Sequence, residues 1–247
     1  MTTERMVSIG EAAEAALAEL TVGPPPPPLA PPPAPPKDDD RPDQVRRWMR
    51  VAGIPDRYLD ARFANWQDRP GTRKAFEAST AVADQPHNLI LVGPWGTGKT
   101  RLAASIIAAR IERWLEAYPD EVIRVDAEGL LTRPPFASRF RSVPQLLDAI
   151  RRSYEYDDEP DPLDELRRVP LLILDDLGRE KATDWVLERL YVLIDDRYGE
   201  SRPTVVTTNY SLMDLARRDY GAMVSRLTED GAVVKIGATD ARPGEAA

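Results

Sequence analysis

Cysteine is absent from this chain of 247 residues, and histidine occurs once, at His87. Without cysteine the chain has no disulfide, no thiolate zinc site and no cysteine nucleophile. A single histidine also excludes a metal site built from several imidazoles. The chemistry of this protein must therefore rest on carboxylates, hydroxyls, amines, guanidinium groups and the backbone.

Long apolar runs are missing as well. A membrane-spanning helix needs about 18 or more consecutive apolar residues, and no segment of the chain reaches that length. The first ten residues, which include Glu4 and Arg5, lack the apolar core of a secretory signal. We therefore expect a cytoplasmic protein without membrane contacts. The net charge of −8 argues against a stand-alone duplex-DNA binder, although a local basic groove is compatible with it.

Proline is concentrated in one segment, because ten of the 24 prolines fall between Gly23 and Pro36. Proline fixes φ and lacks an amide donor, so this tract predicts an extended polyproline II spacer. Before it, residues 8–20 start with a Ser8 cap signal and predict a short helix, which either binds a partner or frays. We divide the chain into a candidate partner-binding helix at 1–22, a disordered proline-rich linker at 23–43 and a folded domain at 44–247.

The folded part alternates short apolar strands with amphipathic helices. Continuous apolar strands that alternate with helices predict a parallel sheet covered by helices on both faces, and hence the α/β fold class. The predicted strands are 88–92, 140–143, 171–174 and 204–208, and the predicted helices are 45–51, 100–115, 144–154, 185–197 and 215–228.

The strongest chemical signal is a glycine-rich segment that matches the P-loop pattern G-x-x-x-x-G-K-[ST] in full, between a predicted strand and a predicted helix. Its glycines let the backbone wrap around phosphate, and the following helix adds its positive N-terminal end. We expect Lys99 to contact the β- and γ-phosphates of ATP and Thr100 to bind Mg²⁺. Trp95 either stacks on the nucleotide or covers the sheet edge. The predicted nucleotide-binding residues are Gly93, Pro94, Trp95, Gly96, Thr97, Gly98, Lys99, Thr100 and Arg101.

Two carboxylates follow the apolar strand 171–174, at Asp175 and Asp176. A carboxylate at the end of a buried strand suits Mg²⁺ binding, and we assign this role to Asp175. We expect Asp176 to orient and deprotonate the attacking water. Because aspartate is one methylene shorter than glutamate, this second role is less secure than the metal role of Asp175.

Two further residues extend the candidate site. Asn209 follows the strand 204–208 and can reach the γ-phosphate or the attacking water, although such an asparagine is also a common turn residue. Arg226 lies in the predicted helix 215–228, and a guanidinium there can stabilise charge on a transferring phosphoryl group. We therefore assign Asn209 a sensor role and Arg226 the role of an arginine finger, with a surface salt bridge as the alternative for Arg226.

These motifs resemble the bacterial and phage DnaC/DnaI-type helicase loaders and the related IstB transposition ATPases. Further matching segments are Gly53-Ile54-Pro55 ahead of Tyr58 and Phe63, together with 177–180, 194–198 and 202–210. The resemblance covers roughly residues 44–236 and implies an AAA+ core, ATP-dependent self-assembly with Arg226 acting in trans, and action on a replicative helicase and single-stranded DNA. Many relatives carry an N-terminal cysteine zinc module, which this chain lacks.

The sequence also departs from the family in its later parts. The segment from Tyr118 to Ser138 resembles an insertion after the P-loop helix. Little chain follows Ile236, so we expect the helical lid domain to be reduced or absent.

The first functional hypothesis is an ATP-dependent helicase loader, an ATPase of low rate that uses ATP and Mg²⁺. The second is an IstB-like transposition helper, which would differ in the partner of the N-terminal helix. A small-molecule kinase would leave Asn209 and Arg226 unexplained, and a non-hydrolysing module would use ATP only to order an interface. Candidate contacts to single-stranded DNA combine charge with aromatic stacking: Arg139, Arg141, Arg151, Arg152, Arg167, Arg168, Arg217 and Arg218, with Phe140 and Tyr154.

Overall fold

The computed structural model describes residues 41–118, 138–155, 161–181 and 183–237. Every described residue belongs to one compact unit, Pro36–Ala247. The predicted helix at 8–20, the proline tract and nearly all of the insertion at 118–138 lie outside the described residues. Among the helices that the structure describes, none is long and apolar enough to cross a membrane.

In the described part of the chain, five parallel strands form one sheet, as the alternating sequence pattern predicted. Their spatial order is β2-β3-β4-β1-β5. Because paired strands run parallel, the chain between them must cross a face of the sheet. The predicted α/β class is therefore confirmed. The strands are β1 (Asn88–Val92), β2 (Ser138–Ser142), β3 (Leu171–Leu177), β4 (Thr204–Thr208) and β5 (Gly231–Lys235).

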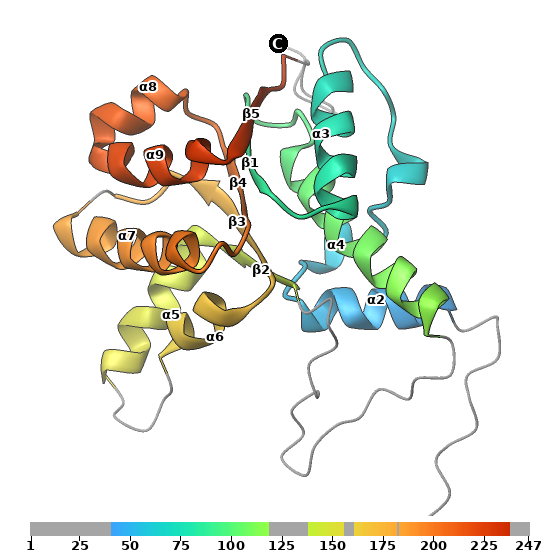
Figure 1. Ribbon diagram of the computed structural model, residues 1–247, viewed down its shortest axis with the longest axis horizontal. Helices are drawn as coiled ribbons and strands as arrows, with labels where there is room; N and C mark the ends of the chain where they lie inside the picture. Colours follow the sequence, from blue (N-terminus) through green and yellow to red (C-terminus); the bar gives the residue numbers. More distant parts are fainter. Residues whose placement is uncertain (1–40, 119–137, 156–160, 182, 238–247) are drawn as a thin grey trace, which may run out of the picture. The chain divides into compact units, whose positions relative to one another are not determined.

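Helices cover both faces of this sheet (Figure 1). Successive side chains of a strand point to opposite faces, and β1 shows the consequence: Leu89 and Leu91 belong to one apolar cluster, Ile90 and Val92 to the other. The first cluster includes α2 (Arg41–Val51), α3 (Arg73–Asp84) and α4 (Lys99–Ala117). The second includes α5 (Val143–Glu155), α6 (Pro162–Arg168), α7 (Asp184–Gly199) and α9 (Gly221–Glu229), with α8 (Leu212–Leu215) beside them.

Local sequence signals explain where several helices begin. Asp161 caps α6 by accepting the Leu163 amide, and Pro162 occupies the first turn, where no amide donor is needed. Thr183 caps α7 in the same way through the Val186 amide. The apolar stripe predicted for α4 is buried along the helix, which fixes α4 against the sheet.

Several predicted boundaries were wrong. Helix α2 already includes Arg41 and Pro42, because proline is tolerated in a first helical turn. Strand β3 continues through both aspartates to Leu177, with an irregular register against β4. The single helix predicted at 215–228 is instead interrupted: a π-helical segment, Ala216–Tyr220, precedes α9, and Asp219 has a left-handed φ of 67° that breaks the helical path.

Candidate nucleotide-binding site

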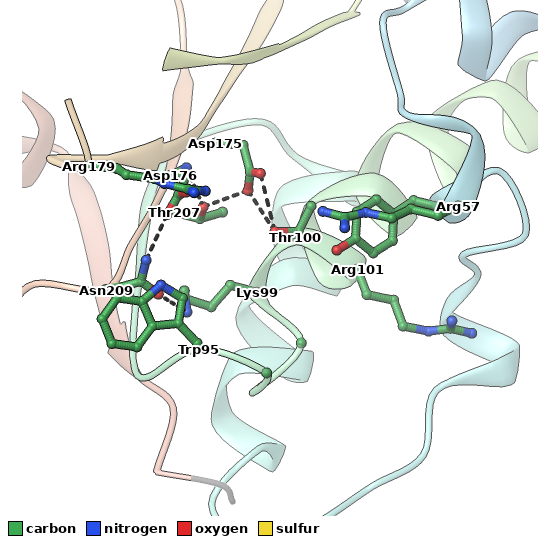
Figure 2. Close-up of a pocket in the computed structure, with 13 residues that line it drawn as sticks. Arg57, Trp95, Lys99, Thr100, Arg101, Asp175, Asp176, Arg179, Thr207 and Asn209 are labelled. Atoms are coloured by element: carbon green, nitrogen blue, oxygen red, sulfur yellow. Dashed lines mark hydrogen bonds and ion pairs between the residues drawn. The ribbon is translucent and has the colours of Figure 1, made fainter. Parts of the chain in front are cut away.

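The P-loop, the acidic pair and Asn209 meet at one edge of the sheet, where the parallel strands β1, β3 and β4 end (Figure 2). Polar side chains from these three strand ends surround a cavity of about 670 Å³. This position follows from the topology, because the carboxyl ends of parallel strands share one edge. The cavity is lined by Arg57, Tyr58, Trp95, Gly96, Gly98, Lys99, Thr100, Arg101, Asp175, Asp176, Arg179, Thr207 and Asn209.

The glycine-rich loop folds as a tight turn between β1 and α4. Gly96 and Gly98 have φ angles of 73° and 98°, which residues with a side chain rarely adopt. A Cβ atom at Gly98 would also lie 2.6 Å from the Trp66 indole, so the close packing requires glycine. Arg69 donates to the Thr97 carbonyl at 2.9 Å and fixes the loop from outside. The first amides of α4, which have no partner within the helix, follow directly after this turn.

Lys99 is buried at the base of the cavity, with 7% of its surface exposed. Its Nζ atom donates to the Gly93 and Pro94 carbonyls, both at 2.7 Å, and to Asn209 Oδ1 at 2.8 Å. All three acceptors are uncharged. The ammonium charge is therefore solvated by dipoles that an anionic ligand can replace.

Asp175 and Thr100 face each other across the cavity floor. The Thr100 hydroxyl donates to the two carboxylate oxygens of Asp175 at 2.9 and 3.2 Å, and Thr207 donates to Oδ1 at 2.6 Å. Burial raises the pKa of the Asp175 carboxyl above its ordinary value, while the hydrogen bonds from Thr207 and Thr100 act against this. The Thr100 hydroxyl oxygen and the Asp175 carboxylate therefore lie close enough together to bind the same cation.

Asp176 follows Asp175 on β3 and has a left-handed φ of 66°. Its amide donates to Thr207 Oγ1 at 3.0 Å, which holds the turned backbone in place. Asn209 Nδ2 donates to Asp176 Oδ1 at 2.7 Å, and Arg179 pairs with Oδ2 at 3.1 Å. A continuous polar chain thus runs from Lys99 through Asn209 and Asp176 to Arg179 (Figure 2).

The donor set fits a small, hard cation bound together with phosphate. In the described part of the chain no group of three or more acidic or histidine side chains could hold a metal alone. Magnesium in phosphate sites usually has one or two protein oxygens, with phosphate and water completing its shell. Thr100 and Asp175 supply such a pair, and Lys99 and the P-loop amides supply the complementary positive charge.

Some predicted site residues lie outside the cavity lining. Gly93, Pro94 and Thr97 shape the loop; the first two accept from Lys99, and the Thr97 hydroxyl donates to Pro94. Trp95 lines the cavity mouth and remains 63% exposed, so it does not cover the sheet edge. His87 lies half-buried before β1, as a loop residue.

Arg226 does not line the cavity of its own chain. It projects from α9, where its Nε atom pairs with Asp195 Oδ1 at 3.0 Å and its guanidinium lies 4.8 Å from the Tyr198 ring centroid. The hydrogen bond to Asp195 is the main cause of a raised pKa at Arg226. Within one chain, therefore, Arg226 is a surface cation held by an acid and an aromatic ring.

The structure also separates the candidate DNA-contacting residues. Phe140 is 1% exposed and cannot stack on a base. Arg139 is paired with Glu165, whereas Arg151 lies 5.3 Å from the Trp185 ring centroid. Of the set, Arg151 thus combines charge with an aromatic surface, and Arg218 does the same over the Tyr210 ring, 4.1 Å away.

Sequence reasoning missed four residues that line the cavity. Arg57 and Tyr58 reach it from a short 3₁₀ helix before α3, with the guanidinium 4.7 Å from the ring centroid. Thr207 binds both aspartates, and Arg179 reaches back to Asp176. The buried threonines that end β4, Thr207 and Thr208, were the local signal, because a buried hydroxyl needs a partner.

A parallel sheet in this order, with a glycine-rich loop after its β1 strand and an acidic pair on β3, defines a P-loop nucleotide-binding protein with an AAA+ fold. No family model matches the chain. The sequence is 29% identical over 124 residues to the ATP-binding protein assigned to insertion sequence IS1162 of Pseudomonas fluorescens, covering 50% of this chain and 44% of that protein. It is 24% identical to the replicative helicase loader DnaI of Bacillus subtilis, covering 50% and 33%.

The comparison with solved structures also indicates a similarity to helicase loaders. A crystal structure of the DnaC helicase loader matches with a TM-score of 0.58 and 25% identity, covering 74% of this chain and 99% of that one. The resemblance to the DnaC/DnaI-type loaders and the IstB-like ATP-binding proteins is thereby confirmed. The chain spans between a third and a half of the length of these two curated relatives.

Proposed function

We propose that this protein is an ATP-dependent loader of a replicative helicase. The observation that carries the proposal is the meeting of Lys99, Thr100, Asp175, Asp176 and Asn209 in one cavity of a loader-like fold. Each of these side chains contacts another member of the group by a hydrogen bond. In this role the protein would act in the cytoplasm, where its helicase partner works.

The same residues divide the work on ATP between them. Lys99 would exchange its carbonyl acceptors for phosphate oxygens, while the P-loop amides hold the remaining phosphate charge. Thr100 and Asp175 would hold Mg²⁺, which neutralises phosphate charge when bound. Asn209 would orient a water molecule against the γ-phosphate, and Asp176 would accept its proton. The water oxygen then bonds to phosphorus as the bond to ADP breaks, which gives ADP and inorganic phosphate.

Self-assembly is the second part of the proposal. Arg226 does not line the cavity of its own chain, so it would act on the nucleotide of a neighbouring copy and stabilise the transferring phosphoryl group there. Its ion pair with Asp195 keeps the guanidinium at the surface until the neighbour binds. Isolated chains should therefore hydrolyse ATP slowly.

The N-terminal region would connect the ATPase to its partner. We propose that residues 1–22 bind the helicase, that 23–43 act as a spacer, and that 44–247 form the ATPase domain. The relative from insertion sequence IS1162 favours a second candidate, a transposition helper with the same ATP chemistry and a transposase as partner. Single-stranded DNA is a proposed ligand of either version.

The test is capture of the replicative helicase of the same organism by the full-length chain. We expect capture with ATP and Mg²⁺, weaker capture with ADP, and loss of capture when residues 1–22 are deleted. The deleted chain should keep its affinity for a fluorescent ATP analogue. Equal capture under all nucleotide conditions, or capture of a purified transposase instead, would refute the loader proposal.

A further inference from the structure

Arg179 lines the cavity and forms an ion pair with Asp176, the proposed base. Its NH1 atom lies 3.1 Å from Asp176 Oδ2, while Asn209 occupies the other oxygen of the same carboxylate at 2.7 Å. Both oxygens of the proposed base are therefore engaged by cavity residues. Each carboxylate oxygen can accept more than one hydrogen bond, and release of either contact would leave Asp176 more open to the attacking water.

The Arg179 contact is the weaker of the two. The Arg179 side chain is 70% exposed, against 22% for Asp176, so the ion pair lies at the mouth of the cavity. Exposed ion pairs contribute little stability, because water and salt screen them. The Asn209 contact is part buried and is supported by Lys99 on the far side of the amide. Exchange of partners is consequently easiest at Arg179.

A phosphate group at the site would compete for this guanidinium. Arg179 and Lys99 line the same cavity. Their side chains are linked by an ion pair and two hydrogen bonds through Asp176 and Asn209. Guanidinium binds phosphate oxygens with two parallel donors, which gives a stronger contact than one carboxylate oxygen at a solvent-exposed edge. A phosphate close to Asp176 would also be repelled by that carboxylate unless a cation lay between them.

We infer that Arg179 binds the γ-phosphate. It exchanges its contact with Asp176 for phosphate oxygens when a triphosphate rather than a diphosphate is bound. This inference rests on the proposed ATP site and adds a specificity-determining residue to it. The exchange has two consequences at once. It favours ATP over ADP, and it frees Asp176 Oδ2 for the attacking water only when the γ-phosphate is present.

The local backbone supports this assignment of Arg179. Gly178 has a φ of 88°, and a Cβ atom there would lie 2.9 Å from the Tyr210 ring. Together with the left-handed Asp176, this turn brings Arg179 back over the end of β3. A regular continuation of the strand would direct residue 179 away from the carboxylate three residues earlier.

The test compares equilibrium affinities for a non-hydrolysable ATP analogue and for ADP, both with Mg²⁺, in the full chain. Wild type should bind the triphosphate more tightly. Arg179→Ala should lower the triphosphate-to-diphosphate affinity ratio by about tenfold, the loss expected for one charge-assisted hydrogen bond. Arg179→Lys should retain part of the ratio, because it keeps the charge and loses the two-donor geometry.

Arg73→Ala is the matched control. Arg73 is 71% exposed and pairs with the nearby Glu77 at 2.7 Å, but it does not line the cavity. We expect an unchanged ratio in this variant. An unchanged ratio in Arg179→Ala, with normal ADP binding, would overturn the inference and leave the ATP site intact. A wild-type chain that binds neither nucleotide would overturn the proposed function as well.

Discussion

Two buried cations, at opposite edges of the same sheet, show how this fold separates stability from chemistry. Arg197 lies at the amino ends of β3 and β4 and is completely buried, donating to Thr204 Oγ1 and to the Leu166, Val169 and Pro203 carbonyls. Lys99 lies at the carboxyl edge, also on uncharged acceptors. The two cations have similar partners, and the difference is access to a cavity.

That difference determines what each charge can do. Burial lowers the pKa of Arg197 to about 9, so the guanidinium stays charged at neutral pH and is enclosed by protein acceptors. No anion can reach it, and its charge serves to join α6, α7 and β4. Lys99 opens on a cavity of about 670 Å³, where phosphate can replace its carbonyl partners. We therefore expect substitutions at Arg197 to affect folding and substitutions at Lys99 to affect binding.

The largest effect is expected at Arg197. Arg197→Met fills similar space but leaves several buried acceptors without donors, which should lower the free energy of unfolding by about 3 kcal/mol or more. Urea denaturation of the full chain measures this change. Arg202→Met is the control: Arg202 also donates to a carbonyl of α6, but its side chain is 32% exposed. Equal losses in the two variants would remove the distinction between enclosed and accessible cations.

Lys99→Ala should have the opposite profile. Water in the cavity can replace the lost donor at Gly93, Pro94 and Asn209, so the free energy of unfolding should change by less than about 1 kcal/mol. Affinity for a fluorescent ATP analogue should fall about 100-fold or more, because a buried charge–phosphate contact is lost. Lys74→Ala, an exposed lysine of α3, should change neither quantity. A large loss of stability in Lys99→Ala with unchanged nucleotide affinity would contradict the assignment of Lys99 to binding rather than folding.

Thr100→Val sharpens the assignment of the carboxyl edge to metal binding. The variant keeps the shape of the side chain and removes the hydroxyl that faces Asp175. We expect wild type to bind the ATP analogue about tenfold more tightly with Mg²⁺ than with a chelator, and Thr100→Val to lose most of that difference. Ser105→Ala, which removes a buried hydroxyl further along α4, should keep it. A full magnesium effect in Thr100→Val would count against this metal site.

The smallest effect on an isolated chain is expected at Arg226. Its ion pair with Asp195 is partly exposed, 38% and 41% for the two side chains, so Arg226→Ala should cost less than about 1 kcal/mol of stability. Nucleotide affinity should stay unchanged, whereas hydrolysis in the assembled state should fall. Mixing Arg226→Ala chains with Lys99→Ala chains should restore part of the hydrolysis, because each supplies what the other lacks. No recovery in the mixture would argue against action in trans.

Much of the fold could be predicted because its central strands carry a direct signal. The runs 171–174 and 204–208 are apolar or β-branched throughout, as expected for strands buried on both faces, and both lie in the centre of the sheet. Strand β5 was missed because it is an edge strand that begins with glycine and stays partly exposed. The interruption falls on Asp219, two residues before Gly221, and periodicity alone could not locate it.

The site was predictable where a short motif fixes its own geometry. The spacing within 93–100 specifies a loop and a helix start, which is why Lys99 and Thr100 lie where the sequence placed them. The contacts of Arg179 and Thr207 depend on a left-handed Asp176 and on the register of β3 against β4. Such long-range details arise only when the sheet has formed.

We propose that phosphate oxygens replace the present hydrogen-bond acceptors of Lys99 when ATP binds. A crystal structure with a non-hydrolysable ATP analogue and Mg²⁺ tests this most directly. We expect Lys99 Nζ to lie on phosphate oxygens, the metal to lie between Thr100 and Asp175, and the triphosphate to lie along the 96–100 amides. A triphosphate bound elsewhere, with Lys99 still donating to the Gly93 and Pro94 carbonyls, would contradict it.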